Sequence, residues 1–149
     1  MTRMRSLLFV PGDRPERFAK AAGSGADAVI FDLEDAVMPA ARSQARRDIA
    51  QFLGAGPRTL PLWVRINPVD TRDALEDLAS AVPARPDGIV LPKARSGADL
   101  QRVDHWLEAL EAEHGIAAGS IKVIALVTET AHAVVHAATF SQPPARVVA

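Results

Sequence analysis

Charged side chains follow the apolar segments of this sequence in succession, and their types define the chemistry that is open to the chain. Carboxylates are the ligands that a hard cation prefers, and a guanidinium can bind a carboxylate or an oxygen that carries negative charge. The sequence has no cysteine, which excludes thiolate metal sites and cysteine nucleophiles. Five apolar segments are followed by such residues: Asp13 and Arg14, then Asp32, Glu34 and Asp35, then Arg65 and Asn67, then Lys93, and lastly Glu129.

The apolar segments are continuous rather than alternating, which is typical of parallel strands buried on both faces. They are rich in Val, Ile and Leu, and they alternate with segments of helical periodicity. We therefore expect right-handed βαβ units in a parallel sheet. The expected strands cover residues 6–10, 28–33, 60–66, 88–91, 121–127 and 145–148, and the expected helices begin near residues 13, 40, 71, 96 and 130, the last ending near 138.

Two architectures suit this alternation, an open doubly wound sheet and a (β/α)8 barrel. A doubly wound sheet that binds a dinucleotide should carry the glycine pattern G-x-G-x-x-G after its first strand. The first turn here is Pro11-Gly12-Asp13-Arg14-Pro15, in which proline and arginine replace those glycines. In a barrel the carboxyl ends of the strands build the active site, and the charged residues occupy those ends. The sequence thus favours an α/β fold of the TIM-barrel type.

Three of the charged residues also have a plain structural interpretation. Arg65 could be a buried arginine that pairs with Glu34 or Asp35, and such a pairing is compatible with a functional role. Glu129 could cap the helix expected after it, because negative charge is favoured at a helix start. Lys93 is interpreted as a structural or general electrostatic residue, since nothing near it in the sequence predicts a lowered pKa.

The overall composition is that of an ordinary globular domain. The chain has 149 residues, 23% of them charged, and a formal net charge of −1, which leaves no basic footprint for nucleic acid. No apolar run approaches the roughly 20 residues that span a membrane, and the apolar run near the N-terminus is too short for a signal peptide. We expect a cytoplasmic protein without a nucleic-acid or membrane partner.

Five sequence blocks give a more specific indication. They read RSLLFVPGDRPERF (residues 5–18), FDLEDAV (31–37), VRINP (64–68), LPK (91–93) and VTETA (127–131). In order and spacing they resemble the citrate lyase β-subunit-like proteins of the HpcH/HpaI aldolase superfamily. The blocks together span nearly the whole chain, so their combination is far more specific than any one of them.

The resemblance implies a (β/α)8 barrel that cleaves or forms carbon–carbon bonds beside a carbonyl, with Mg²⁺ and often with citryl-, malyl- or methylmalyl-type CoA thioesters. It implies that Glu129 is a carboxylate ligand of the metal and that Arg65 binds the substrate and stabilises an enolate. Glu34 and Asp35 would lie beside the metal or assist proton transfer. This chemistry is coherent, because a cation and a guanidinium both stabilise charge that builds on a carbonyl oxygen.

The resemblance also implies a binding region for the CoA part of the substrate. Arg14 and Lys20 would meet the phosphates of CoA at the mouth of the barrel. Phe9 and the turn formed by Pro11 and Gly12 would lie near them. If CoA is absent from the substrate, a free oxo acid is the remaining expectation.

Histidines offer a competing metal site. His132 and His136 are four residues apart on one expected helix face, and Glu129 lies three residues before His132. That spacing is conceivable for a zinc triad. The resembling family does not place histidine ligands here, so we interpret both histidines as residues of the helix face.

A (β/α)8 barrel needs about 250 residues, so residues 1–149 are expected to form a single incomplete barrel domain of about five and a half βα units. The resemblance requires a second metal carboxylate after strand six. We therefore expect the 149-residue chain alone to lack lyase turnover. A non-catalytic remnant or assembly subunit stays open as the alternative, and an exposed sheet edge favours a homo-oligomer.

Overall fold

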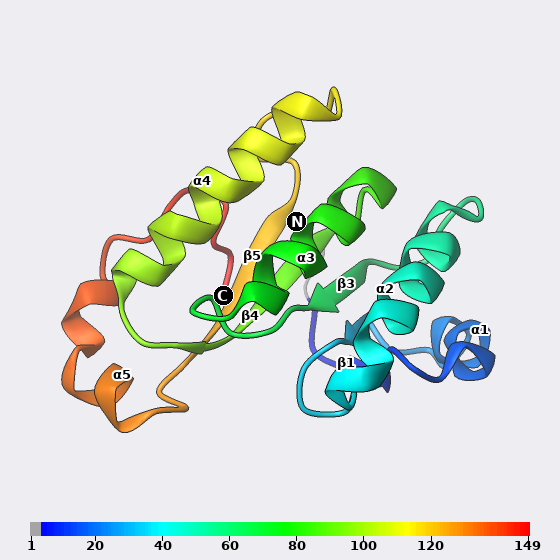
Figure 1. The fold of residues 1–149 in the computed structure, drawn as a ribbon, viewed down its shortest axis with the longest axis horizontal. Coiled ribbons are helices and arrows are strands. Elements are labelled where there is room, and N and C mark those ends of the chain that lie inside the picture. Colours follow the sequence, from blue (N-terminus) through cyan, green and yellow to red (C-terminus); the bar gives the residue numbers. More distant parts are fainter. Residues whose placement is uncertain (1–3) are drawn as a thin grey trace.

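Five parallel strands form one sheet in the order β1-β2-β3-β4-β5, so each strand pairs with the next along the chain. The computed structural model describes residues 4–149, and Figure 1 shows the path of the chain through them. The strands are β1 (Leu7–Pro11), β2 (Ala28–Asp32), β3 (Leu62–Arg65), β4 (Gly88–Ala94) and β5 (Lys122–Val127).

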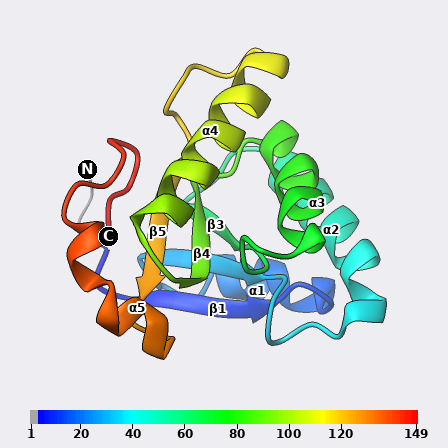
Figure 2. The same cartoon turned by 60° about the vertical axis from the view of Figure 1, so that its left-hand side comes forward.

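Helices connect successive strands. Figure 2 shows α2, α3 and α4 outside the sheet, whose strand direction turns strongly between β1 and β5. Among residues 4–149, no helix is both long enough and apolar enough to cross a bilayer. The helices are α1 (Phe18–Ala22), α2 (Pro39–Gly54), α3 (Arg72–Ala81), α4 (Gly97–Glu113) and α5 (Ala131–Val135), with short 3-10 helices η1 (Pro15–Arg17), η2 (Val82–Ala84) and η3 (Ala137–Phe140).

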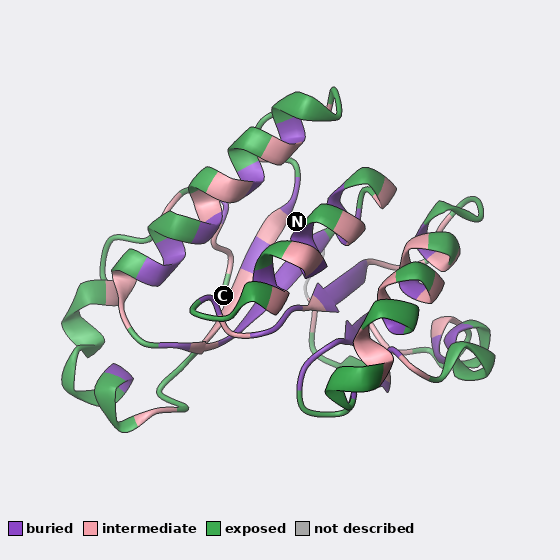
Figure 3. Cartoon of the chain, viewed as in Figure 1, coloured by how far each residue is buried: buried purple, intermediate pink, exposed green. Residues whose placement is uncertain are grey.

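The two faces of the sheet pack against different partners. Alternate strand residues, among them Phe31 and Val64, join the large core that the helices cover. The residues between them form a separate small cluster of Ala28, Ile30, Trp63 and Val90, to which no helix residue within 4–149 contributes. Helices on one face only, together with a strand order that never reverses, are features of a barrel and not of a doubly wound sheet. Figure 3 shows the largely buried central strands beneath the half-exposed helices, whereas β5 is mostly half-buried.

In place of the sixth expected strand, the C-terminal segment forms an isolated parallel bridge beside β5. A parallel bridge joins Val123 to Val147. Val123 N donates to Arg146 O at 2.9 Å, and Val148 N donates back to Val123 O at 2.9 Å. The sequential strand order therefore continues past β5.

Several strand boundaries differ from the expected ones by one or two residues, and three elements differ further in extent or type. The strand expected at 88–91 continues to Ala94, with a register irregularity after Leu91 where Pro92 has no N–H to donate. The helix expected to begin near residue 13 starts as the 3-10 helix η1. The helix expected to run to residue 138 ends at Val135 and is followed by η3.

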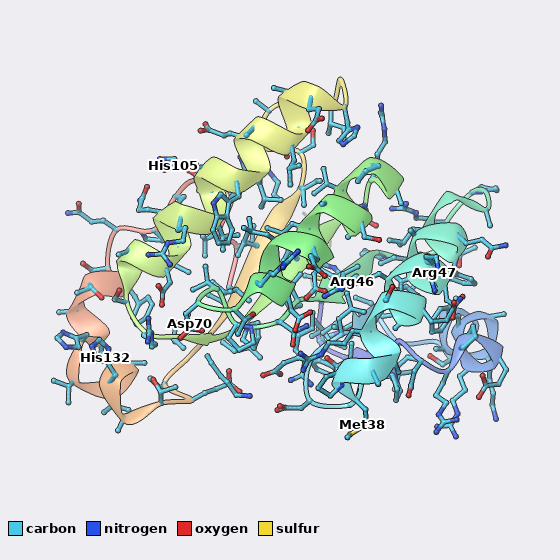
Figure 4. The ribbon with its side chains drawn as sticks, in the orientation of Figure 1. Met38, Arg46, Arg47, Asp70, His105 and His132 are labelled. Atoms are coloured by element: carbon cyan, nitrogen blue, oxygen red, sulfur yellow. The ribbon has the colours of Figure 1, made fainter. Side chains whose placement is uncertain are left out.

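An ion-pair network fixes α2 and α3 against the loop after β3. Arg46, labelled between these helices in Figure 4, donates through Nε to Asp77 Oδ1 at 2.7 Å and through Nη1 to Glu76 Oε2 at 2.7 Å. Asp77 Oδ2 accepts from the backbone N of Asn67 at 2.7 Å. Burial raises the pKa of Asp77, although the hydrogen bonds from Asn67 and Arg46 act in the opposite direction. The network anchors the segment that follows Arg65.

Gly88 at the start of β4 leaves the space that the Trp63 ring occupies. A Cβ at Gly88 would lie 2.1 Å from Trp63 Cζ3 and 2.7 Å from Lys122 O. Trp63 is 2% exposed and belongs to the small cluster on the helix-free face. Any side chain at residue 88 must therefore displace the largest member of that cluster.

We expect Gly88→Ala to lower the free energy of unfolding by about 1–3 kcal/mol, because overpacking forces the ring or the backbone to move. Gly54→Ala is the matched control, since no heavy atom lies within 4 Å of a Cβ at this last residue of α2. It should be neutral or stabilise by up to about 1 kcal/mol. Urea unfolding followed by tryptophan fluorescence and circular dichroism measures both. Equal stability of the two variants would contradict the close packing of Trp63 on Gly88.

Candidate active site

Asp32 and Arg65 end neighbouring strands in register, and their side chains form a bidentate ion pair. Arg65 Nε donates to Asp32 Oδ1 at 2.7 Å, and Nη2 donates to Oδ2 at 2.6 Å. The Asp32 hydrogen bonds raise the pKa of Arg65, which outweighs the opposing effect of burial. The guanidinium is thereby fixed in orientation at the carboxyl end of the sheet.

Asp32 also organises the loop that follows β2. Its Oδ1 accepts from Glu34 N at 2.9 Å and its Oδ2 accepts from Ala36 N at 3.1 Å. The carboxylate is 2% exposed, so its charge is balanced inside the protein by Arg65 and these backbone groups. Arg65 therefore pairs chiefly with Asp32, which the sequence did not indicate as its partner.

Glu34 lies on the other side of the guanidinium. Arg65 Nη1 is 3.2 Å from Glu34 Oε2, but this buried oxygen has no aligned hydrogen-bond donor among the described residues. The Phe9 ring contacts the same guanidinium, with 4.9 Å between Arg65 Cζ and the ring centroid. Glu34 is only 3% exposed, so its free oxygen is an acceptor held next to a fixed cation.

Lys93 joins Glu34 to Asp35. Its Nζ donates to Glu34 Oε1 and, at 3.0 Å, to Asp35 Oδ1. Hydrogen bonds to Glu34 and Asp35 raise the pKa of Lys93, and the hydrogen bond from Lys93 lowers the pKa of Asp35. Lys93 and Asp35 are therefore both charged near neutral pH.

Glu129 accepts a hydrogen bond from the backbone of Lys93. Lys93 N donates to Glu129 Oε2 at 2.6 Å. Lys93 has φ 51° and Thr128 has φ 68°, so both strand ends adopt left-handed backbone that L-residues disfavour. The capping alternative for Glu129 is wrong, because the Thr130 side chain caps α5 by accepting from Ala133 N at 3.1 Å.

Four residues selected from the sequence thus meet in one connected cluster at the carboxyl ends of β2 to β5. Glu34, Asp35 and Glu129 are linked through Lys93, and Arg65 adjoins Glu34. Asp32 and Lys93 were expected at strand ends, but no role in the site was predicted for either of them, although both stand in the matching blocks. Asp32 could have been found from its position, because it lies near the end of one expected strand and Arg65 lies near the end of the next.

The residues predicted to bind CoA fall into two groups. Phe9, Pro11 and Lys20 line one hollow between β1 and α1. Gly12 is outside that lining and has a structural role, since its N donates to Asp32 O at 2.8 Å and a Cβ would lie 2.6 Å from that oxygen. Arg14 is also outside the lining, with Nε 3.7 Å from Asp13 Oδ1 and a side chain that is 56% exposed.

Carboxylate oxygens are the only strong metal donors in this cluster. Glu129 is exposed, and its Oε1 has no hydrogen-bond partner among residues 4–149, whereas the unpaired oxygen of Glu34 is buried beside Arg65. Within residues 4–149 no group of three or more His, Cys, Asp or Glu side chains is arranged around a common metal position. The donors fit a hard cation that keeps most of its water, as Mg²⁺ does.

The two histidines lie apart from this cluster. Figure 4 labels His132 on α5, and its Nδ1 is 3.2 Å from Arg95 O. The rings of His132 and His136 have centroids 4.1 Å apart. They form a stacked pair on the helix surface, and Glu129 is directed to Lys93 N instead.

Comparisons with known proteins agree with this architecture. The chain is 35% identical over 133 residues to the citrate lyase subunit beta of Haemophilus influenzae, covering 85% of this chain and 44% of that protein. It is 40% identical over 116 residues to an L-malyl-CoA/beta-methylmalyl-CoA lyase of Cereibacter sphaeroides, covering 74% and 36% of the two proteins.

Solved structures of protein CitE from Mycobacterium tuberculosis are similar as well. The complex with magnesium and acetate has a TM-score of 0.74 at 35% identity and covers 95% of this chain and 51% of CitE. The complex with magnesium, acetoacetate and coenzyme A has a TM-score of 0.71 at 35% identity, with coverage of 95% and 45%. These likenesses confirm the predicted α/β fold of the TIM-barrel type.

The chain spans about half the length of the relatives it matches, or somewhat less. Residues 5–146 match the family described as HpcH/HpaI aldolase/citrate lyase, and this range contains all five strands and every residue of the strand-end cluster. The predicted resemblance is therefore confirmed, and the chain belongs to the HpcH/HpaI aldolase/citrate lyase family.

Proposed function

We propose that this chain is the N-terminal part of a Mg²⁺-dependent carbon–carbon lyase that acts on an acyl-CoA thioester or a related oxo acid. One observation carries the proposal: a guanidinium fixed by Asp32 lies beside the orphaned oxygen of Glu34, in the cluster that also contains Glu129. The lyases among the relatives and the magnesium and CoA complexes of CitE support it.

Arg65 would bind the substrate carbonyl or carboxylate. A guanidinium has five N–H donors, and the hydrogen bonds to Asp32 use one on Nε and one on Nη2. The remaining donors of a group that cannot rotate are suited to an oxygen on which negative charge develops as the carbon–carbon bond breaks. Because the pairing with Asp32 already fixes the geometry, little reorganisation is needed during reaction.

Glu34 and Asp35 would handle the proton that leaves the substrate hydroxyl. Glu34 Oε2 is the better placed acceptor, because it is buried, lacks a donor and lies 3.2 Å from Arg65 Nη1. Asp35 is mostly exposed and could pass the proton to solvent. Glu129 would hold Mg²⁺, which when bound would supply positive charge that stabilises the charge developing on the substrate carbonyl oxygen. The homo-oligomeric state and the cytoplasmic location stay predictions.

Replacing Glu129 tests the metal assignment. Glu129→Gln should weaken Mn²⁺ binding by at least about tenfold, because it removes the charge of the main carboxylate ligand of a water-rich site. Electron paramagnetic resonance measures free Mn²⁺, and added Mg²⁺ should compete. Glu108→Gln on the exposed face of α4 is the matched control. The assignment is wrong if both variants bind Mn²⁺ as the native chain does.

Charge reversal tests the proposed CoA contacts. Lys20→Glu should weaken CoA binding by about tenfold and flatten its dependence on ionic strength, since phosphate contacts are electrostatic. Arg14→Glu should have a smaller effect, because Arg14 lies outside the hollow that Lys20 lines. Arg102→Glu, an exposed change on α4, is the control. Calorimetry that gives one affinity for all three variants would exclude this role for the hollow.

Turnover tests the reaction itself. The chain alone should be inactive, whereas its fusion to the part of the Haemophilus influenzae subunit that follows the matched region should split citryl-CoA or malyl-CoA into acetyl-CoA and an oxo acid. Glu129→Gln and Arg65→Lys should each lower kcat of the fusion by at least about a hundredfold. Release of free CoA without acetyl-CoA would indicate thioester hydrolysis and contradict a lyase. Turnover by the chain alone would show that the missing part is dispensable.

A further inference from the structure

Lys93 occupies an unusual position in the strand-end cluster. Its ammonium is held between the carboxylates of Glu34 and Asp35, which come from the loop after β2. Its backbone N–H, pointing to a different partner, holds the carboxylate of Glu129 after β5. One residue of β4 thus links acidic groups that lie almost a hundred positions apart in the sequence.

The charges of the cluster explain why a cation is needed there. Asp32, Glu34, Asp35 and Glu129 contribute four carboxylates, and Arg65 is largely committed to Asp32. Lys93 is then the cation shared by Glu34 and Asp35. Two carboxylate oxygens that contact the same Nζ atom lie close enough together for a divalent cation to bridge them. Mg²⁺ and Mn²⁺ need only one or two protein carboxylates.

We propose that Lys93 is a positioning residue whose ammonium takes the place of a divalent cation between Glu34 and Asp35, so that among the carboxylates of this cluster the catalytic metal is directed to Glu129. The inference deepens the proposed function and rests on it. Lys93 keeps a metal ion out of the space between Glu34 and Asp35 and leaves Glu129 as the open carboxylate. The left-handed backbone at residue 93 serves this arrangement by turning the N–H toward Glu129 and the side chain toward Glu34.

Removal of the ammonium should therefore change metal binding and catalysis in opposite directions. Lys93→Met keeps most of the length of the side chain and the same left-handed penalty, and it removes the ammonium with its charge and its hydrogen-bond donors. Mn²⁺ binding by the 149-residue chain should become about tenfold tighter, because a divalent ion now enters between two carboxylates that have lost their shared ammonium. In the fusion described above, kcat should fall while KM changes little. A residue that merely stabilised the fold would weaken both binding and turnover.

Two further variants locate the effect. Lys93→Arg restores the cation and should return Mn²⁺ affinity to within about twofold of the native value. Adding Asp35→Asn to Lys93→Met removes one of the two freed ligands and should abolish the gain in affinity. Far-UV circular dichroism checks the fold, and Lys93→Gln, which is also neutral, carries the same expectation if Lys93→Met does not fold.

Unchanged or weaker Mn²⁺ binding by the folded neutral variants would overturn the inference. Its failure is distinguishable from failure of the proposed function. If Glu129→Gln has no effect on Mn²⁺ binding but Lys93→Met tightens it, the role of Lys93 stands and the metal assignment of Glu129 falls. If Glu129→Gln weakens binding but Lys93→Met does not tighten it, the metal assignment stands and the role of Lys93 falls.

Discussion

The carboxylate of Asp32 is the group on which the rest of the site depends. It accepts two hydrogen bonds from Arg65 and two from the backbone of the following loop, at Glu34 and Ala36. With 2% exposure it cannot be solvated by water, so its charge must be balanced by these contacts. Loss of one partner of such a buried pair typically costs about 3–5 kcal/mol, since the other charge is left uncompensated. The pair therefore fixes the guanidinium and the loop together.

The remaining contacts extend from this pair toward β5. Glu34 is placed by its backbone hydrogen bond to Asp32, Lys93 is placed by Glu34, and Glu129 is placed by the backbone of Lys93. Left-handed backbone at Lys93 and Thr128 indicates local strain at the two strand ends where the last contact forms. Strain of this kind persists only where surrounding packing supports it, and the buried part of β4 gives that support. The contacts that stabilise the strand ends are thus made by the same residues, Glu34, Lys93 and Glu129, to which the proposed function assigns roles.

The sequence predicted the strand–helix alternation and the strand-end position of the charged residues, because continuous apolar runs and helical periodicity are local signals. It also predicted the family, since five blocks occur in order. It could not assign Asp32 as the partner of Arg65, which depends on the register of β2 with β3. Nor could it assign Lys93, whose contacts depend on an irregularity at the end of β4. The close approach of Trp63 to Gly88 is likewise a property of packing between strands.

The incomplete sheet explains how a chain of this length holds so much of the site. Parallel strands in sequential order bring their carboxyl ends together one after another, so the first five strands already bring Glu129, the fixed guanidinium of Arg65 and the carboxylate of Glu34 into one cluster. The helix-free face carries a small cluster around Trp63, and the relatives are about twice as long as this chain. The metal-binding properties of the cluster can therefore be measured on this chain separately from the turnover of a longer barrel.

The most direct measurement is the anomalous diffraction of Mn²⁺ in crystals of the native chain. Our account predicts one peak about 2.2 Å from a carboxylate oxygen of Glu129, with Lys93 Nζ still between Glu34 and Asp35. A peak between Glu34 and Asp35 with Lys93 displaced, or a metal at His132 and His136, would contradict it.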